Sequence, residues 1–180
     1  MSNISRFILK ILGWRFEGNI PYKLKKAIII VYPHTSAWDL IIGLVIRSAI
    51  DMDIKFIGKA ELFKGPFAWL FYSLGGQPVV RQKSTNYVES VVKVFNEKEE
   101  LIIAMSPEGT RKRVERFKTG FYYIAIGAKI PIVMVRFDFG RKIIHFAKPF
   151  FPSGNIEQDM DAIYEHFRGI KGKIPSKGFL

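Results

Sequence analysis

Runs of hydrophobic residues alternate with stretches of helical character along much of the chain. Residues 27–31, 101–105 and 130–135 are nearly continuous apolar runs rich in Ile and Val, which is typical of strands buried on both faces of a parallel sheet. Helices are predicted between and after these runs, at residues 40–50 and 120–128. The alternation predicts an α/β fold, with a mostly parallel central sheet and helices on both of its faces.

Shorter segments complete the predicted order of elements. Further strands are expected at residues 54–59, 78–81 and 142–146. Asn is favoured at helix starts, so we expect one helix to be capped by Asn86, with Glu89 at the capping-box position, and a last helix to be capped by Asn155.

Two apolar segments have more than one interpretation. Residues 67–74 are aromatic and aliphatic nearly all round, so they form either a core helix or the wall of a ligand pocket or a membrane-facing surface. Residues 3–14 are amphipathic, which suits either a short helix lying in a membrane interface or a helix packed on the protein's own core. The apolar side of this helix holds Ile4, Phe7, Ile8 and Ile11, and the opposite side holds Arg6 and Lys10.

The length of 180 residues favours one domain over residues 1–180. Within it, residues 1–18 contain the amphipathic helix, and residues 169–180 are basic and contain Gly and Pro, which predicts a frayed tail. No apolar stretch reaches the roughly 20 residues that span a bilayer, and the first residues lack the apolar region and cleavage site of a secretory signal. We therefore expect a peripheral protein on the cytoplasmic side of a membrane.

The amino-acid composition limits the kinds of binding partner and the kinds of catalytic or metal site that the protein can have. The net charge of +12, from 28 basic and 16 acidic residues, predicts a polyanionic partner, of which an anionic membrane surface and phosphorylated substrates are the candidates, because the sequence contains no nucleic-acid recognition motif. The absence of cysteine excludes disulfides, thiolate metal sites and a Cys nucleophile. Three histidines with no close pair argue against a zinc site, so no metal is predicted.

A histidine and a carboxylate lie where the first buried strand gives way to a helix. His34 and Asp39 follow residues 27–31, and ligands of open α/β sheets bind at the carboxyl ends of strands. An imidazole whose tautomer is fixed by a nearby carboxylate is a general base. A second interpretation stays open, because Ser36 and Asp39 also have the spacing of a helix-capping pair.

Two further strand ends carry arginine. Arg81 ends the strand predicted at residues 78–81, and the strand at residues 101–105 leads into Glu108, Gly109, Thr110 and Arg111. Guanidinium groups bind phosphate oxygens in pairs, and glycine exposes backbone amides to an anion. The pattern therefore predicts a phosphate clamp at the same edge of the sheet as His34.

Together these residues resemble the glycerolipid acyltransferase superfamily, in particular the 1-acyl-sn-glycerol-3-phosphate acyltransferases. The resemblance covers about residues 27–136, with the family's blocks in their expected order. The matching segments are His34 to Asp39, Gly76 to Arg81, Glu108 to Arg111 and Ile130 to Val135, with Gly58 to Leu62 and Phe117 to Gly120 in support.

The sequence also departs from the family pattern. Pro33 precedes the histidine where the family often has Asn, and Met134 stands where a proline is common. The loop between Arg111 and Phe117 is shorter than usual. Many relatives have a longer hydrophobic N-terminal region, whose task would fall here to residues 3–14.

The resemblance implies an O-acyltransferase of phospholipid biosynthesis. An acyl group would pass from acyl-CoA or acyl carrier protein to a lysophospholipid hydroxyl, most simply that of 1-acylglycerol 3-phosphate, with no cofactor. His34 would be the general base and Asp39 would orient it. Arg81 and Arg111 would bind the acceptor phosphate. The other substrate-binding candidates are Glu108, Gly109, Thr110, Lys59 and Lys118.

Several alternatives remain open at this point. The same chemistry would serve glycerol 3-phosphate or a lyso-aminolipid as acceptor, and water as acceptor would make the protein a thioesterase-like hydrolase. A basic membrane-binding module without catalysis is a different class of function. His145 and His166, in a predicted strand and a predicted helix, receive no catalytic role.

Overall fold

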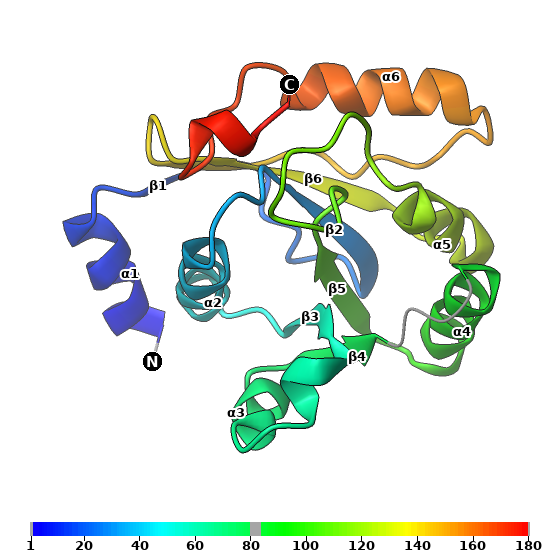
Figure 1. Cartoon of the computed structure of the whole chain (residues 1–180), viewed down its shortest axis with the longest axis horizontal. Helices are drawn as coiled ribbons and strands as arrows, with labels where there is room; N and C mark the ends of the chain where they lie inside the picture. Colours follow the sequence, from blue (N-terminus) through cyan, green and yellow to red (C-terminus); the bar gives the residue numbers. More distant parts are fainter. Residues whose placement is uncertain (1, 80–83, 180) are drawn as a thin grey trace.

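A computed structural model describes residues 2–79 and 84–179, and within these residues a single mixed sheet of seven strands forms the centre of the molecule (Figure 1). Its strand order is β1-β7-β6-β2-β5-β3-β4, and every neighbouring pair is parallel except β6 and β7. The strands are β1 (Arg15–Gly18), β2 (Lys26–Tyr32), β3 (Ile54–Lys59), β4 (Gly76–Val79), β5 (Leu101–Met105), β6 (Ile132–Asp138) and β7 (Ile143–Phe146).

Helices cover both faces of the sheet, which confirms the predicted α/β fold (Figure 1). Side chains alternate along β2, so that Ile28 and Ile30 face one core while Ala27 and Ile29 face the other. The first core packs under α4 (Ser84–Glu97), α5 (Gly120–Ala128) and α6 (Ile156–Phe167). The second packs under α1 (Ser2–Ile11) and α2 (Trp38–Ile50). The short helices are η1 (Ala60–Phe63), α3 (Ala68–Ser73) and η2 (Pro175–Lys177).

One edge of the sheet contains a strand that the sequence pattern did not predict. β1 pairs in parallel with β7, and β7 pairs antiparallel with β6. The four residues of β1 are largely exposed, so they lack the apolar run by which the inner strands are recognised. This edge strand connects α1 to the sheet.

Helix α1 docks with the side opposite to its main apolar stripe. Leu9 is only 1% exposed and packs in the second core, while Phe7 on the stripe is 64% exposed. The Ser5 hydroxyl donates to Ser48 Oγ at 2.8 Å and Arg6 Nε donates to the Ala49 carbonyl at 2.8 Å, both at the end of α2. The interpretation in which this helix packs on the protein's own core is therefore confirmed for Leu9, while the apolar stripe of Ile4, Phe7, Ile8 and Ile11 stays exposed.

Helix α3 is not a core helix, contrary to one of the two interpretations of its apolar sequence. It buries no residue completely, and Trp69 is 68% exposed. The helix lies beyond the edge strand β4, where Phe71 and Tyr72 contact the ring of Phe63. An element at the sheet edge has one neighbouring layer, so part of its apolar surface stays exposed.

The two predicted helix caps have different outcomes. Asn155 is confirmed as an N-cap, because its side-chain oxygen accepts from the Gln158 amide at 3.3 Å. The predicted cap at Asn86 is wrong, because α4 begins at Ser84 and includes Asn86. Ser84, Thr85 and Asn86 are three consecutive residues suited to a helix start, so the pattern could not select among them.

The tail predicted to be frayed is packed on the molecule. Ile170 is buried in the first core, Gly172 is buried, and the chain then forms η2. The Ile174 amide donates to Thr35 Oγ1 at 3.1 Å and the Phe179 amide donates to the Tyr32 hydroxyl at 3.2 Å. The prediction of a frayed tail relied on the basic composition of this segment. It gave too little weight to two apolar residues, Ile170 and Phe179, whose packing holds the segment in place.

In the described part of the chain, no helix combines the length and the apolar character needed to cross a membrane.

Candidate active site

Strand β2 lies in the centre of the sheet, and the predicted histidine follows shortly after the carboxyl end of this strand. β2 lies between β5 and β6 and is parallel to both, so its carboxyl end opens where ligands of α/β folds bind. After Tyr32 the chain enters the loop of residues 33–37, which we call the His34 loop, and then begins α2. The loop lines a cleft with a volume of about 2160 Å³.

His34 and Asp39 are in direct contact. His34 Nδ1 lies 3.0 Å from Asp39 Oδ2, and the His34 side chain is 31% exposed whereas that of Asp39 is 5% exposed. Both residues line the cleft. A neutral imidazole that donates from Nδ1 to a carboxylate carries its free electron pair on Nε2. This geometry suits a base that takes a proton from a ligand in the cleft.

Asp39 also makes hydrogen bonds with the backbone of the His34 loop. Its Oδ2 accepts from the amides of Thr35 and Ser36, each at 2.8 Å. The second of these bonds is one that a capping pair would make, but the N-cap residue of α2 is Ala37, which makes no side-chain cap bond. The same carboxylate oxygen contacts the His34 ring. The carboxylate therefore fixes the backbone that carries His34 as well as the ring.

Glu108 supports the His34 loop from beneath. It is 0% exposed, and its Oε2 accepts from the His34 amide at 2.5 Å and from the Ser106 hydroxyl at 3.4 Å. No described residue provides a hydrogen-bond partner for Glu108 Oε1. In this buried position Glu108 supports the backbone of the His34 loop.

Burial raises the pKa of Glu108 to about 7. The hydrogen bonds from the His34 amide and from Ser106 act in the opposite direction, and the nearby charge of Asp39 adds a smaller increase. A carboxyl group with this pKa is partly protonated at neutral pH, which suits its apolar position.

The loop after β5 carries the other predicted residues. Gly109 has φ of +64°, and a Cβ at that position would lie 2.9 Å from Lys118 Cδ, so the side chain of Lys118 crosses directly over the glycine. Thr110 Oγ1 accepts from the Lys112 amide at 3.3 Å. Arg111 is exposed and, like Lys118, lines the cleft that contains His34. The structure thus brings the predicted loop and the histidine together.

Two of the predicted binding residues are not placed in the site by the structure. Arg81 lies outside the described residues. Lys59 is the last residue of β3, where the backbone is described and the side chain is not. Their predicted roles stay predictions.

The walls of the cleft combine a basic loop with apolar side chains. Residues 111–118, which we call the basic loop, all line the cleft. Apolar lining comes from β2, α2, β3 and α3, and includes Val31, Leu40, Leu44, Ile57 and Phe71. Such a lining accommodates a molecule that has both an anionic group and a hydrocarbon part.

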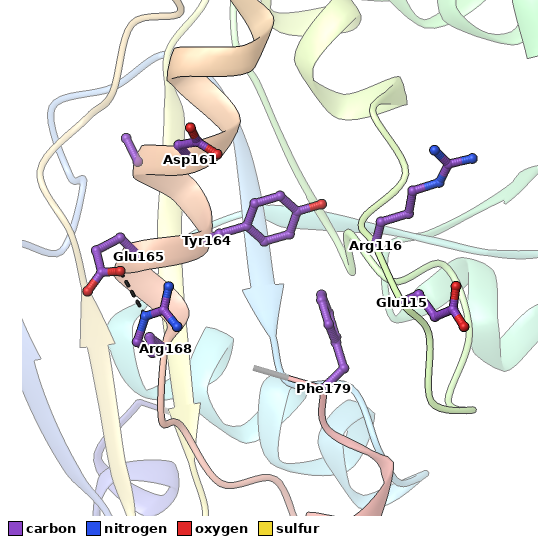
Figure 2. Close-up of a pocket in the computed structure, with 8 residues that line it drawn as sticks. Glu115, Arg116, Asp161, Tyr164, Glu165, Arg168 and Phe179 are labelled. Atoms are coloured by element: carbon purple, nitrogen blue, oxygen red, sulfur yellow. Dashed lines mark hydrogen bonds and ion pairs between the residues drawn. The ribbon is translucent and has the colours of Figure 1, made fainter.

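An open hollow of about 760 Å³ lies on the other side of the basic loop, against α6 (Figure 2). Tyr164 extends from α6 toward the basic loop, and Arg168 is paired with Glu165 at 2.8 Å. No residue of the His34 loop lines this hollow. We therefore place the site in the larger cleft.

His145 and His166 lie away from the cleft, which neither of them lines. Their rings are 5.9 Å apart, and Arg136 Nε donates to the His166 carbonyl at 2.7 Å. Burial, with the charge of Arg136, lowers the pKa of His166 to about 4 and also lowers that of His145. Within residues 2–79 and 84–179, no group of three or more His, Asp or Glu residues is arranged so that it could hold a metal ion.

Comparison with known proteins gives consistent matches. The chain is 32% identical over 160 residues to human 1-acyl-sn-glycerol-3-phosphate acyltransferase beta, a match that covers 84% of this chain and 56% of the human protein. It is 28% identical over 165 residues to the 1-acyl-sn-glycerol-3-phosphate acyltransferase of Haemophilus influenzae, covering 80% of this chain and 67% of that protein. The chain thus spans little more than half the length of the human relative.

A solved structure has the same fold. The crystal structure of the 1-acyl-sn-glycerophosphate (LPA) acyltransferase PlsC from Thermotoga maritima superposes with a TM-score of 0.61 at 18% sequence identity, over 93% of this chain and 75% of that chain. The sequence profile of the family described as Acyltransferase matches residues 14–138, which include His34, Asp39 and residues 108–111. Because this match extends over well more than half of the 180 residues, the chain belongs to the acyltransferase family.

Proposed function

We propose that the chain transfers a fatty acyl group from a thioester to the free hydroxyl of 1-acylglycerol 3-phosphate. The observation that carries the proposal is the contact of His34 Nδ1 with Asp39 Oδ2 at 3.0 Å, in a cleft that also holds the basic loop. The human and Haemophilus relatives are named for this acceptor, which supports the proposal.

In the proposed reaction His34 Nε2 takes the proton of the acceptor hydroxyl while the hydroxyl oxygen attacks the thioester carbonyl. Asp39 stabilises the imidazolium that forms. When the tetrahedral intermediate collapses, the C–S bond breaks and the departing thiolate receives the proton from the imidazolium. Base assistance of this kind contributes about 10²–10⁴-fold to the rate. The acceptor hydroxyl attacks directly, so the reaction needs no Ser or Cys nucleophile.

The lining of the cleft supports a lipid phosphate as the acceptor group. Arg111 and Lys118 supply cationic donors for phosphate oxygens, and Arg81 is proposed to join them. The apolar walls would hold an acyl chain. The donor is proposed to be acyl-CoA or acyl carrier protein, and no cofactor takes part.

We also propose that α1 rests on an anionic membrane, where the lipid substrates reside. Ile4, Phe7, Ile8 and Ile11 form an exposed apolar stripe, and the net charge of +12 complements anionic headgroups. The helix is held to α2 through Leu9, Ser5 and Arg6, which leaves the stripe free to enter the interface.

The test is an acyl-transfer assay with purified protein, with 1-acylglycerol 3-phosphate as acceptor and a panel of acyl-CoA and acyl carrier protein donors. His34→Gln should reduce kcat by about 10²-fold or more, because Gln cannot act as a base. His145→Gln is the matched control, since this histidine does not line the cleft, and it should keep wild-type turnover.

Each other outcome points to a different function. Wild-type-like transfer by His34→Gln would refute the base assignment. Transfer only to glycerol 3-phosphate or to a lyso-aminolipid would change the acceptor. Release of free fatty acid without acceptor would identify a hydrolase. Binding to vesicles without turnover on any donor would favour a non-catalytic membrane module.

A further inference from the structure

The C-terminal residues 172–179, which we call the C-terminal strap, cross the His34 loop (red in Figure 1). The Ile174 amide donates to Thr35 Oγ1 at 3.1 Å, directly beside His34, and the Phe179 amide donates to the Tyr32 hydroxyl at 3.2 Å. Thr35 is fully buried. Two hydrogen bonds on either side of η2 thus tie the strap to the residues that precede and follow the histidine.

Aromatic packing fixes the end of the strap between Tyr32, at the end of β2, and Phe117 of the basic loop. The Phe179 ring lies 5.9 Å from that of Tyr32, 5.1 Å from that of Phe117 and 6.2 Å from that of Tyr164. The Phe117 amide also donates to the Tyr164 hydroxyl at 3.0 Å. Figure 2 shows Phe179 and Tyr164 together on one side of the hollow, with Arg116 of the basic loop across from them. The strap therefore occupies a defined position.

Lys177 lies in the middle of this fixed segment and lines the same cleft as His34. Its side chain is half-buried, and no described carboxylate pairs with it. The carboxylates that line the cleft are Asp39, which binds His34, and Glu115. A half-buried lysine without a carboxylate partner, in a cleft with excess positive charge, is suited to an anionic ligand.

We propose that Lys177 binds a phosphate monoester of a substrate in the active-site cleft. The proposal rests on the proposed function, which brings two such groups to the cleft: the phosphate of the lysophospholipid acceptor and the 3′-phosphate of CoA in the donor. Lys177 lies outside residues 14–138, which match the acyltransferase family. The strap thus adds a cation to the site that the family's motifs do not contain.

The test compares Lys177→Ala with Lys173→Ala in steady-state kinetics. Lys173 is an exposed residue of the same strap and does not line the cleft, so it is the matched control. Lys177→Ala should raise the KM of the substrate that carries the phosphate by about tenfold, the typical size of one charge-assisted hydrogen bond. Its kcat should stay within about twofold of wild type, and Lys177→Arg should restore the KM.

Changing one substrate at a time identifies the source of the phosphate. If the acceptor supplies it, the effect of Lys177→Ala persists when acyl-pantetheine replaces acyl-CoA and is absent with 1-acylglycerol, which has no phosphate. If CoA supplies it, the effect is lost both with acyl-pantetheine and with acyl-3′-dephospho-CoA, which lacks only the 3′-phosphate. An unchanged KM for both substrates in Lys177→Ala would overturn the proposal.

A binding measurement separates this proposal from the proposed function. Glycerol 3-phosphate and adenosine 3′,5′-bisphosphate are titrated into the wild-type protein and into Lys177→Ala by calorimetry. We expect one of the two ligands to bind about tenfold more weakly to the variant. If the wild type and Lys177→Ala bind each of the two ligands with the same affinity, the role of Lys177 is refuted. Failure of the wild type to transfer acyl groups would refute only the proposed function. Equal melting temperatures of the two proteins establish that the variant is folded.

Discussion

At the scale of single residues, the candidate active site contains two carboxyl groups with different contacts. Asp39 contacts the imidazole and the Thr35 and Ser36 amides, while Glu108 contacts the His34 amide from a fully buried position. One carboxyl group orients the ring and the other fixes the backbone below it. The His34 loop is therefore held from both sides before any substrate binds.

The buried position of Glu108 predicts a dependence of stability on pH. Its pKa of about 7 in the folded protein lies above the ordinary value of 4.5, so the folded state binds this proton more tightly than the unfolded state does. Linkage then makes the free energy of unfolding fall as pH rises from about 4.5 through about 7. The full difference corresponds to about 3 kcal/mol at most.

Glu108→Gln tests this prediction, because Gln keeps an acceptor for the His34 amide and has no proton to release. We expect the free energy of unfolding of the wild type, relative to that of the variant, to decrease between pH 5 and pH 8, measured by urea denaturation. Parallel curves for the two proteins over this pH range would show that Glu108 does not titrate as described.

Most of the candidate residues named from the sequence lie in or beside the cleft, but the sequence did not predict all of their contacts. The His-x4-Asp spacing predicted the His34–Asp39 contact, because the two residues are near neighbours across one turn. Glu108 lies 74 residues from its hydrogen-bond partner His34. Only its place in a motif pointed to it, and its position beneath the loop could not be read from that motif.

At the scale of elements, the C-terminal strap depends on close packing at one glycine. A Cβ at Gly172 would lie 2.6 Å from Thr35 Oγ1 and 3.1 Å from Pro33 Cγ. Both neighbours belong to the His34 loop and are buried, so they cannot move away easily. The glycine thus permits the strap to lie directly on the loop.

Gly172→Ala should therefore lower the free energy of unfolding by about 1–3 kcal/mol, the usual cost of overpacking. Gly43→Ala is the matched control, because a Cβ at this position in α2 meets no atom within 4 Å and alanine favours the helix by about 0.5–1 kcal/mol. Urea denaturation measures both changes. A neutral or stabilising effect of Gly172→Ala would show that the strap is not closely packed on the loop.

Elements in the middle of the sheet were predicted better than those at its edges. β2, β5 and β6 are covered on both faces, so their sequences are continuous apolar runs. β1, α3 and the strap lie at the periphery, where short exposed sequences carry little periodic signal. For α1 the amphipathic pattern predicted a helix, while the contacts with Ser48 and Ala49 decide which face of it docks.

At the scale of the whole molecule, we expect electrostatic attraction and apolar burial to bind the protein to a membrane. The salt dependence of binding separates these two contributions. The net charge of +12 attracts anionic lipids over a distance that salt shortens, while the apolar stripe of α1 contributes by burial, which salt does not weaken. Binding to anionic vesicles should therefore fall between 0.05 and 0.5 M NaCl, by roughly an order of magnitude or more.

The measurement is co-sedimentation with neutral and with anionic vesicles. The double variant Phe7→Ser/Ile11→Ser should weaken binding at both salt concentrations, by about tenfold or more from the lost apolar burial. Phe151→Ser is the control, because Phe151 is equally exposed but does not lie on α1. Salt-independent binding would exclude the electrostatic contribution, and unchanged binding of the double variant would exclude α1 as the interface helix.

The sequence by itself determined the α/β fold and the candidate base with its carboxylate. These properties are local: apolar runs reflect burial on both faces of a strand, and the spacing of His34 and Asp39 spans a single turn. The tertiary structure decided which side of α1 docks, that Glu108 lies beneath the His34 loop, and that Lys177 enters the cleft. The strap contacts join residues 139 and 147 positions apart, and no local pattern specifies such a distant partner. Their geometry follows from the packing of the whole chain.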